Sequence, residues 1–217
     1  MHGQLPKLAR HLVLAAQADL PEVTLVGGAG LALLLGHRTS LDIDLFCRAA
    51  NDLPVVISRL EAAAIENGAR LTSVRTAPTF RRLEIDVNEE LVRLDVAVDA
   101  APLLDPQCPI VDDVRVLSLR DQRANKIVTL LGRSELRDLV DLYVLERNGW
   151  PFLDGIDDAS RKDAGVDLAW LAWATGQITI NELPGLVVPI DRVDLKQFRD
   201  TISEALLDRA GALPEPK

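Results

Sequence analysis

The sequence contains few of the residues that indicate disulfide-bonded, metal-rich or membrane-spanning proteins. Two cysteines occur among its 217 residues, Cys47 and Cys108, and neither has a histidine or cysteine neighbour at metal-ligand spacing. Isolated reduced thiols of this kind are typical of a cytoplasmic protein. No apolar stretch approaches the roughly 20 residues that a helix needs to span a bilayer. We therefore expect a cytoplasmic protein with no membrane partner.

Aromatic and basic residues are also scarce. Aromatic side chains make up 4% of the residues while 48% of the residues are hydrophobic, so the core must consist mainly of Leu, Val, Ile and Ala. Lys and Arg number 24 against 33 Asp and Glu, which gives a formal net charge of −9. This balance argues against a protein whose main task is to hold nucleic acid by its phosphates. A nucleic-acid substrate bound in a local basic groove stays possible.

The apolar pattern predicts an α+β protein with a mixed sheet at the N-terminus and a helical region at the C-terminus. Residues 23–35 are typical of a buried strand that breaks at a glycine pair and continues as an apolar helix. We place a domain boundary near residue 115, giving an α/β core over 1–115 and a helical region over 116–217. Further helices are expected near residues 8–16, 52–67, 118–131, 135–147, 161–174 and 194–210, and further strands at 41–46, within 70–98 and near Val114. The Pro-rich end, Leu213 to Lys217, is expected to be disordered.

The strand predicted at 41–46 carries two acids on one face. Its sequence, LDIDLF, alternates strictly, so Asp42 and Asp44 project from the face opposite Ile43. Like charges so placed repel each other unless a cation lies between them. Mg²⁺ suits such a site because it takes hard oxygen ligands and keeps open positions for substrate phosphates. An exposed strand face is the usual alternative for an isolated Asp-x-Asp.

Gly27 and Gly28 supply the second half of a possible site. A glycine pair between a strand and a helix lets the backbone approach a phosphate group, whose charge the helix N-terminus favours. Nucleotidyl transfer requires metal-binding carboxylates close to a backbone segment that binds phosphates, and one helix would connect the two here. Asp95, on the strand LVRLDVAVD, would supply a third metal ligand from a separate strand. A simple turn is the alternative for the glycines, and Asp86 and Asp99 are further acids near Asp95.

Two segments resemble motifs of a known family. GGAGLALLLGHRTSLDIDLF (27–46) is similar to the first motif of the AbiEii/AbiGii-type nucleotidyltransferase toxins, which belong to the polymerase β-like superfamily. ANKIVTLLGRSELRDLVDLYVL (124–145) resembles a later motif of the same family, with a Lys, an arginine-containing turn and Arg-Asp-x-x-Asp-Leu. The resemblance covers roughly residues 23–145 and implies a polymerase β-like nucleotidyltransferase fold.

The resemblance also implies roles for individual residues. Gly27 and Gly28 would bind the triphosphate of an NTP, and Asp42 and Asp44 would hold Mg²⁺. Further roles are implied for Ser40 at a phosphate, Lys126 toward the phosphates, Asp138 as an acid that completes the active site, and Arg38 at substrate. For Asp138 the alternative is an ion pair with Arg133 or Arg137, and for Arg38 it is a contact that holds Asp42 in place. Trp170 and Trp173 are expected to pack into the C-terminal core, and Asp157-Asp158 to lie in a loop as a helix cap.

Three functions remain open from the sequence. The family resemblance implies a toxin that transfers NMP from an NTP to an acceptor such as tRNA or a protein, with a cognate antitoxin as partner. An aminoglycoside-type transferase with a small cationic acceptor would share the same core, and the acidic net charge favours it. The third is a non-catalytic module that binds nucleotide or a partner protein. The complete set of acids favours catalysis.

Overall fold

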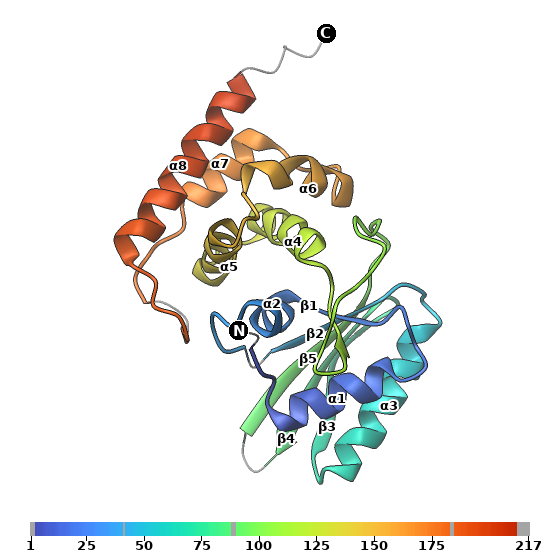
Figure 1. The fold of residues 1–217 in the computed structure, drawn as a ribbon. Helices are drawn as coiled ribbons and strands as arrows, with labels where there is room; N and C mark the ends of the chain where they lie inside the picture. The colour runs from blue at the N-terminus through green and yellow to red at the C-terminus, as the bar shows by residue number, and fades with distance from the viewer. Residues whose placement is uncertain (1–2, 41, 88–89, 183–184, 212–217) are drawn as a thin grey trace. The chain divides into compact units, whose positions relative to one another are not determined.

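The computed structural model describes residues 3–40, 42–87, 90–182 and 185–211 (Figure 1). Its contacts group the chain into two compact units: unit 1 comprises 1–100 and 106–118, and unit 2 comprises 101–105 and 119–217. The domain division at residue 115 stays a prediction. Leu41, the first residue of one predicted strand, and the Pro-rich end from Leu213 lie outside the described residues. Within the described ranges, no helix is long and apolar enough to cross a membrane.

Unit 1 is built on a five-stranded mixed sheet with the order β1-β2-β5-β4-β3 (Figure 1). The β2 and β5 strands are parallel, and every other neighbouring pair is antiparallel. A separate two-stranded sheet joins β6 and β7. The strands are β1 (Thr24–Val26), β2 (Ile43–Cys47), β3 (Arg70–Ala77), β4 (Phe80–Val87), β5 (Glu90–Val98), β6 (Ile110–Val111) and β7 (Val114–Arg115).

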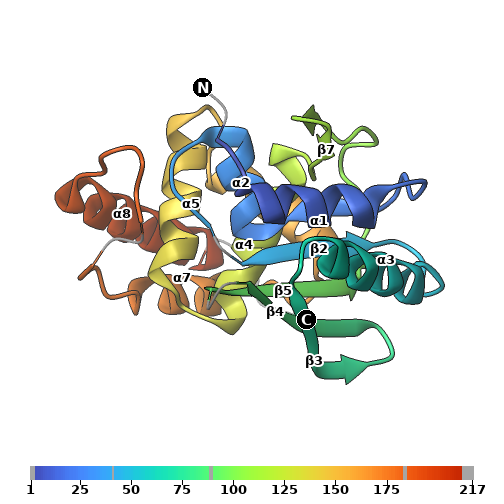
Figure 2. The same cartoon turned by 90° about the horizontal axis from the view of Figure 1, so that it is seen from below.

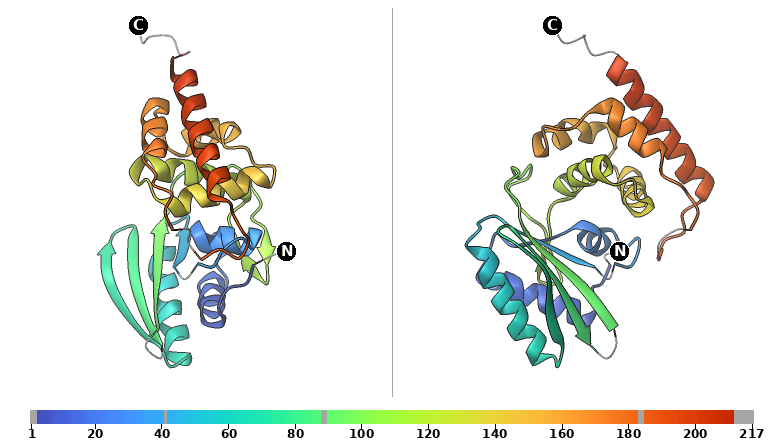
Figure 3. Two further views of the ribbon diagram at one scale, coloured as in Figure 1. Left: turned by 90° about the vertical axis from the view of Figure 1, so that its left-hand side faces the viewer. Right: turned by 180° about the vertical axis from the view of Figure 1, so that it is seen from behind.

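One face of the sheet forms the core of unit 1. Ile43 and Leu45 of β2 are 1% exposed, and Leu94 and Val96 of β5 are fully buried. Helices α1 (Lys7–Gln17) and α3 (Asp52–Glu66) pack together and contribute their apolar residues to the same core (Figures 2 and 3). Because side chains alternate between the two faces of a strand, the residues between these core positions project from the opposite face. We call this opposite side the acid face.

Helix α2 (Gly27–Leu35) follows β1 directly and packs on β1 and β2. Its residues from Ala29 to Leu33 are all buried, which agrees with an apolar helix predicted from the sequence. The helix begins at Gly27, which has a φ of 64°. Glycine adopts this left-handed conformation readily, whereas other residues are strained there. The turn from strand to helix therefore depends on glycine at this position.

Unit 2 is helical, and α4 contacts α5, α6 and α7 while α7 packs on α8 (Figure 1). Helix α4 carries Lys126 of the second motif on its buried side. The helices are α4 (Leu119–Gly132), α5 (Leu136–Arg147), α6 (Ile156–Lys162), α7 (Leu168–Gly176) and α8 (Arg192–Gly211), with a 3₁₀ turn at Leu153–Gly155.

The single helix predicted over 161–174 was wrong, because the chain turns between α6 and α7. The amide of Gly165 donates to Oδ1 of Asp163 at 2.8 Å, and the amide of Trp170 donates to Oδ1 of Asp167 at 2.7 Å. Short acidic side chains that bond to nearby amides compete with helix formation and cap the helix that follows. These two aspartates divide the segment.

The expected burial of two tryptophans was also wrong. Trp170 and Trp173 are 50% and 53% exposed, with their rings stacked at a centroid distance of 4.6 Å. The indole Nε1 of Trp170 donates to the carbonyl of Leu131 at 3.0 Å, which satisfies its polar group. The pair packs on itself at the surface of unit 2 and only partly on the core.

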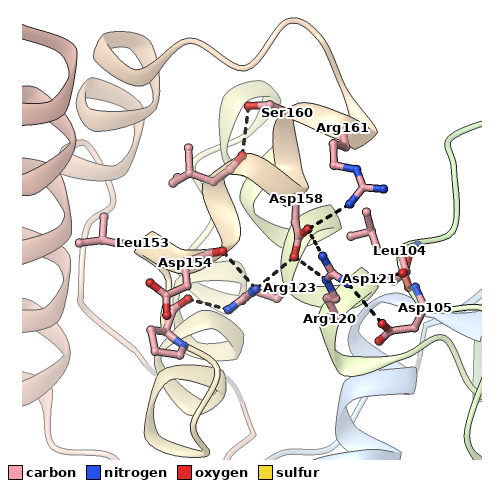
Figure 4. A network of polar contacts seen from close by, with 12 residues as sticks. Leu104, Asp105, Arg120, Asp121, Arg123, Leu153, Asp154, Asp158, Ser160 and Arg161 are labelled. Carbon is pink, nitrogen blue, oxygen red and sulfur yellow. Dashed lines mark hydrogen bonds and ion pairs between the residues drawn. The ribbon is translucent and has the colours of Figure 1, made fainter. Parts of the chain in front are cut away.

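A network of charged residues connects α4 to α6 within unit 2 (Figure 4). Arg120 donates from Nε and Nη2 to both oxygens of Asp158, at 2.8 and 2.7 Å, and Arg123 reaches the same carboxylate at 3.3 Å. The hydrogen bonds from Arg120 hold the pKa of Asp158 below its usual range, and the charges of both arginines add to this effect against the opposing effect of burial. Asp158 lies inside the first turn of α6 and is 6% exposed, so its predicted loop position was wrong.

Candidate active site

Two of the predicted acids are direct neighbours on the acid face. Asp44 of β2 and Asp95 of β5 occupy paired positions in the parallel ladder. Neighbouring strands lie about 4.8 Å apart, so the two carboxylates project side by side. Asp42 precedes β2 by one residue and is half-buried, as are Asp44 and Asp95. The fold thus brings together acids that are about fifty positions apart in the sequence.

The first glycine of the predicted phosphate cradle lies against one of these acids. A Cβ atom built on Gly27 would overlap Oδ2 of Asp44. Only a residue without a side chain allows this approach, in addition to the left-handed φ at the same position. The start of α2, whose first amide groups have no partner within the helix, therefore lies directly beside Asp44. A helix N-terminus favours negative charge.

The second glycine lies against two other predicted site residues, Arg38, predicted at substrate, and Ser40, predicted at a phosphate. A Cβ atom on Gly28 would overlap Nη2 of Arg38 and would lie 3.1 Å from Oγ of Ser40. Arg38 is 7% exposed and donates from Nη1 to the carbonyl of Thr39 at 3.2 Å. Ser40 donates to the carbonyl of Asp42 at 3.4 Å. Unit 1 thus brings Asp44, Arg38 and Ser40 to the two glycines at the start of α2.

An arginine that the sequence did not single out holds Asp95. Arg82 of β4 is paired with Asp95 in the antiparallel ladder, and its Nε and Nη2 donate to both carboxylate oxygens at 2.8 and 2.7 Å. The hydrogen bond to Asp95 raises the pKa of Arg82 above its ordinary value, against the opposing effect of desolvation. The negative charges of Asp44 and Asp42 raise this pKa further. All three predicted acids therefore act on one guanidinium.

The three acids suit Mg²⁺ in chemistry and charge, although they are not gathered around one point. Across the described ranges, no three Asp, Glu, His or Cys side chains are close enough to hold one metal ion. Carboxylate oxygens are the ligands that Mg²⁺ prefers. Asp95 binds the guanidinium of Arg82, and the negative charges of Asp44 and Asp42 act on the same guanidinium. Asp95 would have to exchange this guanidinium for a metal ion, because Arg82 bonds to both of its oxygens.

The remaining predicted site residues form a buried ion cluster in unit 2. Nζ of Lys126 lies 2.7 Å from Oδ1 of Asp138 and 2.6 Å from Oδ2 of Asp141. Both aspartates are fully buried and Lys126 is 5% exposed. Burial lowers the pKa of Lys126, but the charges of Asp141 and Asp138 outweigh it, so the net shift is upward. The lysine is therefore held as a cation.

Arg133 completes this cluster from its edge. Its Nε donates to Oδ2 of Asp138 at 3.0 Å, so the arginine pair considered as an alternative for Asp138 is present. Asp141 was missed as a cluster member, although the pattern Arg-Asp-x-x-Asp-Leu places it one helical turn after Asp138. The roles of Lys126 toward phosphates and of Asp138 in catalysis stay predictions.

Comparison with known proteins links both motifs to one family. A family model described as "Nucleotidyl transferase AbiEii toxin, Type IV TA system" matches residues 9–214. A search of curated proteins gave no match.

Three solved structures have a similar fold. A candidate nucleotidyltransferase from H. pylori has a TM-score of 0.63 and 19% identity, with 97% of this chain and 96% of that chain covered. JHP933 from Helicobacter pylori has a TM-score of 0.61 and 18% identity over 96% and 95% of the chains. MenT4, nucleotidyltransferase toxin Rv2826c from Mycobacterium tuberculosis H37Rv, has a TM-score of 0.61 and 17% identity over 96% and 87%. The predicted fold class is confirmed.

Proposed function

The chain belongs to the AbiEii family of nucleotidyltransferase toxins, and from this premise we propose that it transfers NMP from an NTP to an acceptor RNA, such as tRNA, or to a protein. An acceptor hydroxyl attacks the α-phosphorus, the bond to the β-phosphate breaks, and pyrophosphate leaves. The hydroxyl proton passes to one of the carboxylates of Asp42, Asp44 and Asp95. The observation that carries this proposal is the pairing of Asp44 with Asp95 beside the start of α2.

In unit 1, one set of residues would bind the metal and another would bind the phosphates. Asp42, Asp44 and Asp95 would hold Mg²⁺, which supplies charge neutralisation on the phosphates and the leaving group. Gly27 and Gly28 let the backbone lie close to Asp44, Arg38 and Ser40, because a side chain at either position would overlap these residues. Their amide groups would bind the triphosphate there. Ser40 and Arg38 would bind phosphate oxygens beside Gly28. For Lys126 and Asp138 of the second motif, we keep the roles that the family implies: Lys126 toward the phosphates and Asp138 as a further acid.

The partner and the acceptor follow from the family and remain proposals. Because the family model describes a toxin of a type IV toxin–antitoxin system, we infer a cognate antitoxin as partner and a cytoplasmic location. A small cationic acceptor is the second candidate, because the formal net charge of −9 would attract it. A module that binds nucleotide without turnover is the third. The completeness of the acid group supports an active enzyme over this last possibility.

Transfer of labelled nucleotide tests the proposal directly. Purified protein with Mg²⁺ and each of the four α-³²P-labelled NTPs is incubated in bacterial extract that contains RNA and protein. We expect label in an RNA or protein band, and no label with the Asp42→Ala/Asp44→Ala double variant. Label that appears with both proteins would contradict the proposed role of Asp42 and Asp44. No label on any macromolecule from any NTP would contradict the proposed acceptor class. In the second case, calorimetry with NTP separates a protein that binds nucleotide, either a small-molecule transferase or a binding module, from a protein that does not.

Replacing Arg82 with glutamine is expected to tighten metal binding. Arg82 competes with a metal ion for both oxygens of Asp95, so its removal should increase Mn²⁺ affinity on the order of tenfold, which corresponds to about 1.4 kcal/mol. The measurement is electron paramagnetic resonance of free Mn²⁺ with NTP-free protein, which does not depend on turnover. Arg75→Gln is the matched control, because it removes the same charge one strand farther from Asp95. Equal affinities for wild type and Arg82→Gln would show that the acids do not bind metal where Arg82 lies.

A further inference from the structure

Edge strand β3 contains an extra residue, two strands away from Asp95 in the sheet. Ser73 is paired with Leu83 and Arg75 with Arg82, although Leu83 and Arg82 are adjacent in sequence. Val74 is therefore inserted as a β-bulge, which shifts the later residues of β3 to the other face of the sheet. As a result Arg75, instead of Val74, lies opposite Arg82 on the acid face. Bulges often re-aim a side chain next to an active site.

The bulge creates an unusual charge pattern across four strands. Asp44, Asp95, Arg82 and Arg75 follow one another in register from β2 through β5 and β4 to β3. Like charges directly opposite each other on neighbouring strands are destabilising. Arg82 is compensated by Asp95, whereas Arg75 is exposed and forms no ion pair with another described residue. The chain thus maintains two adjacent guanidiniums in a protein that is acidic as a whole.

A phenylalanine holds both guanidiniums in place. Cζ of Arg75 lies 5.6 Å from the centroid of the Phe80 ring, and Cζ of Arg82 lies 5.7 Å from it. An arginine stacked on an aromatic ring keeps its N–H groups free for bonds in the plane of the guanidinium. Phe80 is paired with Ala77 at the end of the hairpin, on the same face as the two arginines. The platform is therefore built from neighbouring residues of two strands.

We propose that Arg75 and Arg82, stacked on Phe80, form a binding site for a phosphate group beside the acid row. Guanidinium groups match phosphate oxygens in geometry and form short charge-assisted hydrogen bonds with them. Arg82 can serve this site once Asp95 exchanges it for metal, and about a third of its side chain is exposed, at 36%. The phosphate belongs either to the triphosphate of the NTP or to the backbone of a nucleic-acid acceptor. This choice of sources rests on the proposed function.

Binding of two probes tests the site without any need for transfer. Affinities for a fluorescent ATP analogue and for a fluorescein-labelled single-stranded RNA are measured in Mg²⁺ buffer for wild type, Arg75→Ala and Arg75→Lys. Arg70→Ala is the matched control, because Arg70 is an exposed residue of the same strand and face but lies opposite Asp86. We expect Arg75→Ala to weaken binding of at least one probe about tenfold, and Arg75→Lys to weaken it less.

Each outcome identifies or removes the site. A loss confined to the RNA, with a salt dependence reduced by about one charge, assigns the site to an acceptor backbone. A loss confined to the ATP analogue assigns it to the triphosphate, and a loss of both assigns it to a phosphate that both probes place there. Wild-type affinities in Arg75→Ala, losses matched by Arg70→Ala, or no wild-type binding of either probe would overturn the proposal. Because transfer is not measured, an inactive protein that binds phosphate here would refute the proposed function alone.

Discussion

Replacing Asp44 with asparagine is expected to lower the rate of nucleotidyl transfer by roughly a thousandfold, which corresponds to about 4 kcal/mol of transition-state stabilisation. Asparagine keeps the shape of the side chain against Gly27 and removes its charge beside Asp95. Stability should change little, because the lost charge also relieves the repulsion between neighbouring carboxylates. The measurements are single-turnover transfer of the labelled NTP and thermal unfolding followed by circular dichroism.

Asp86→Asn is the control for this experiment. Asp86 is an exposed acid of β4 that projects from the same face of the sheet as Asp44, opposite Leu91 and Arg70. Its replacement removes an equal charge from the acid face at a distance from Asp95, and the transfer rate should stay within about twofold. A tenth or more of the wild-type rate in Asp44→Asn would show that this carboxylate does not hold the metal on which transfer depends.

The sheet residues could be predicted because burial alternates along a strand with a period of two. The sequence placed Ile43 and Leu45 on one face of the strand and Asp44 on the other, and the structure has the first two 1% exposed. The glycine pair could be predicted because only glycine satisfies both a left-handed turn and a close approach. These properties depend on a few neighbouring residues, so they can be recognised in a single chain.

The partners of the acids could not be predicted, because they depend on strand order and register. Nothing in the local sequence indicates that β5 lies between β2 and β4, and this order alone brings Arg82 to Asp95. The position of Arg75 depends in addition on the bulge, because in an unbroken ladder Val74 would lie opposite Arg82. The bulge thus places Arg75 opposite Arg82, where Val74 would otherwise lie.

The helical unit was less predictable because its core contains charges. A helix pattern normally assigns Lys and Asp to the exposed face, yet Lys126, Asp138 and Asp141 are buried. The opposite error affected Trp170, which the pattern assigned to the core although half of it is exposed. In both cases pairing decides the outcome: the buried charges neutralise one another, and the exposed indole stacks on Trp173.

Replacing Lys126 with methionine is expected to lower the free energy of unfolding by about 3–5 kcal/mol, which corresponds to a fall in melting temperature on the order of 10 °C. The substitution keeps most of the side-chain volume and leaves Asp138 and Asp141 buried with one cation fewer. Arg133 still donates to Asp138, so part of the charge of that carboxylate stays compensated. The measurement is denaturant unfolding followed by the helical signal in circular dichroism.

Lys196→Met separates the effect of burial from the loss of a lysine. Lys196 pairs with Asp200 at 2.7 Å on α8, but its side chain is 64% exposed, so its replacement should cost less than about 1 kcal/mol. The double variant Lys126→Met/Asp141→Asn should recover part of the lost stability, because it also removes one of the two buried carboxylates that contact the lysine. If Lys126→Met instead unfolds like wild type and loses affinity for NTP, the lysine is available to phosphates and the buried cluster does not require it. A stability loss that the double variant relieves would assign Lys126 first to the core of unit 2.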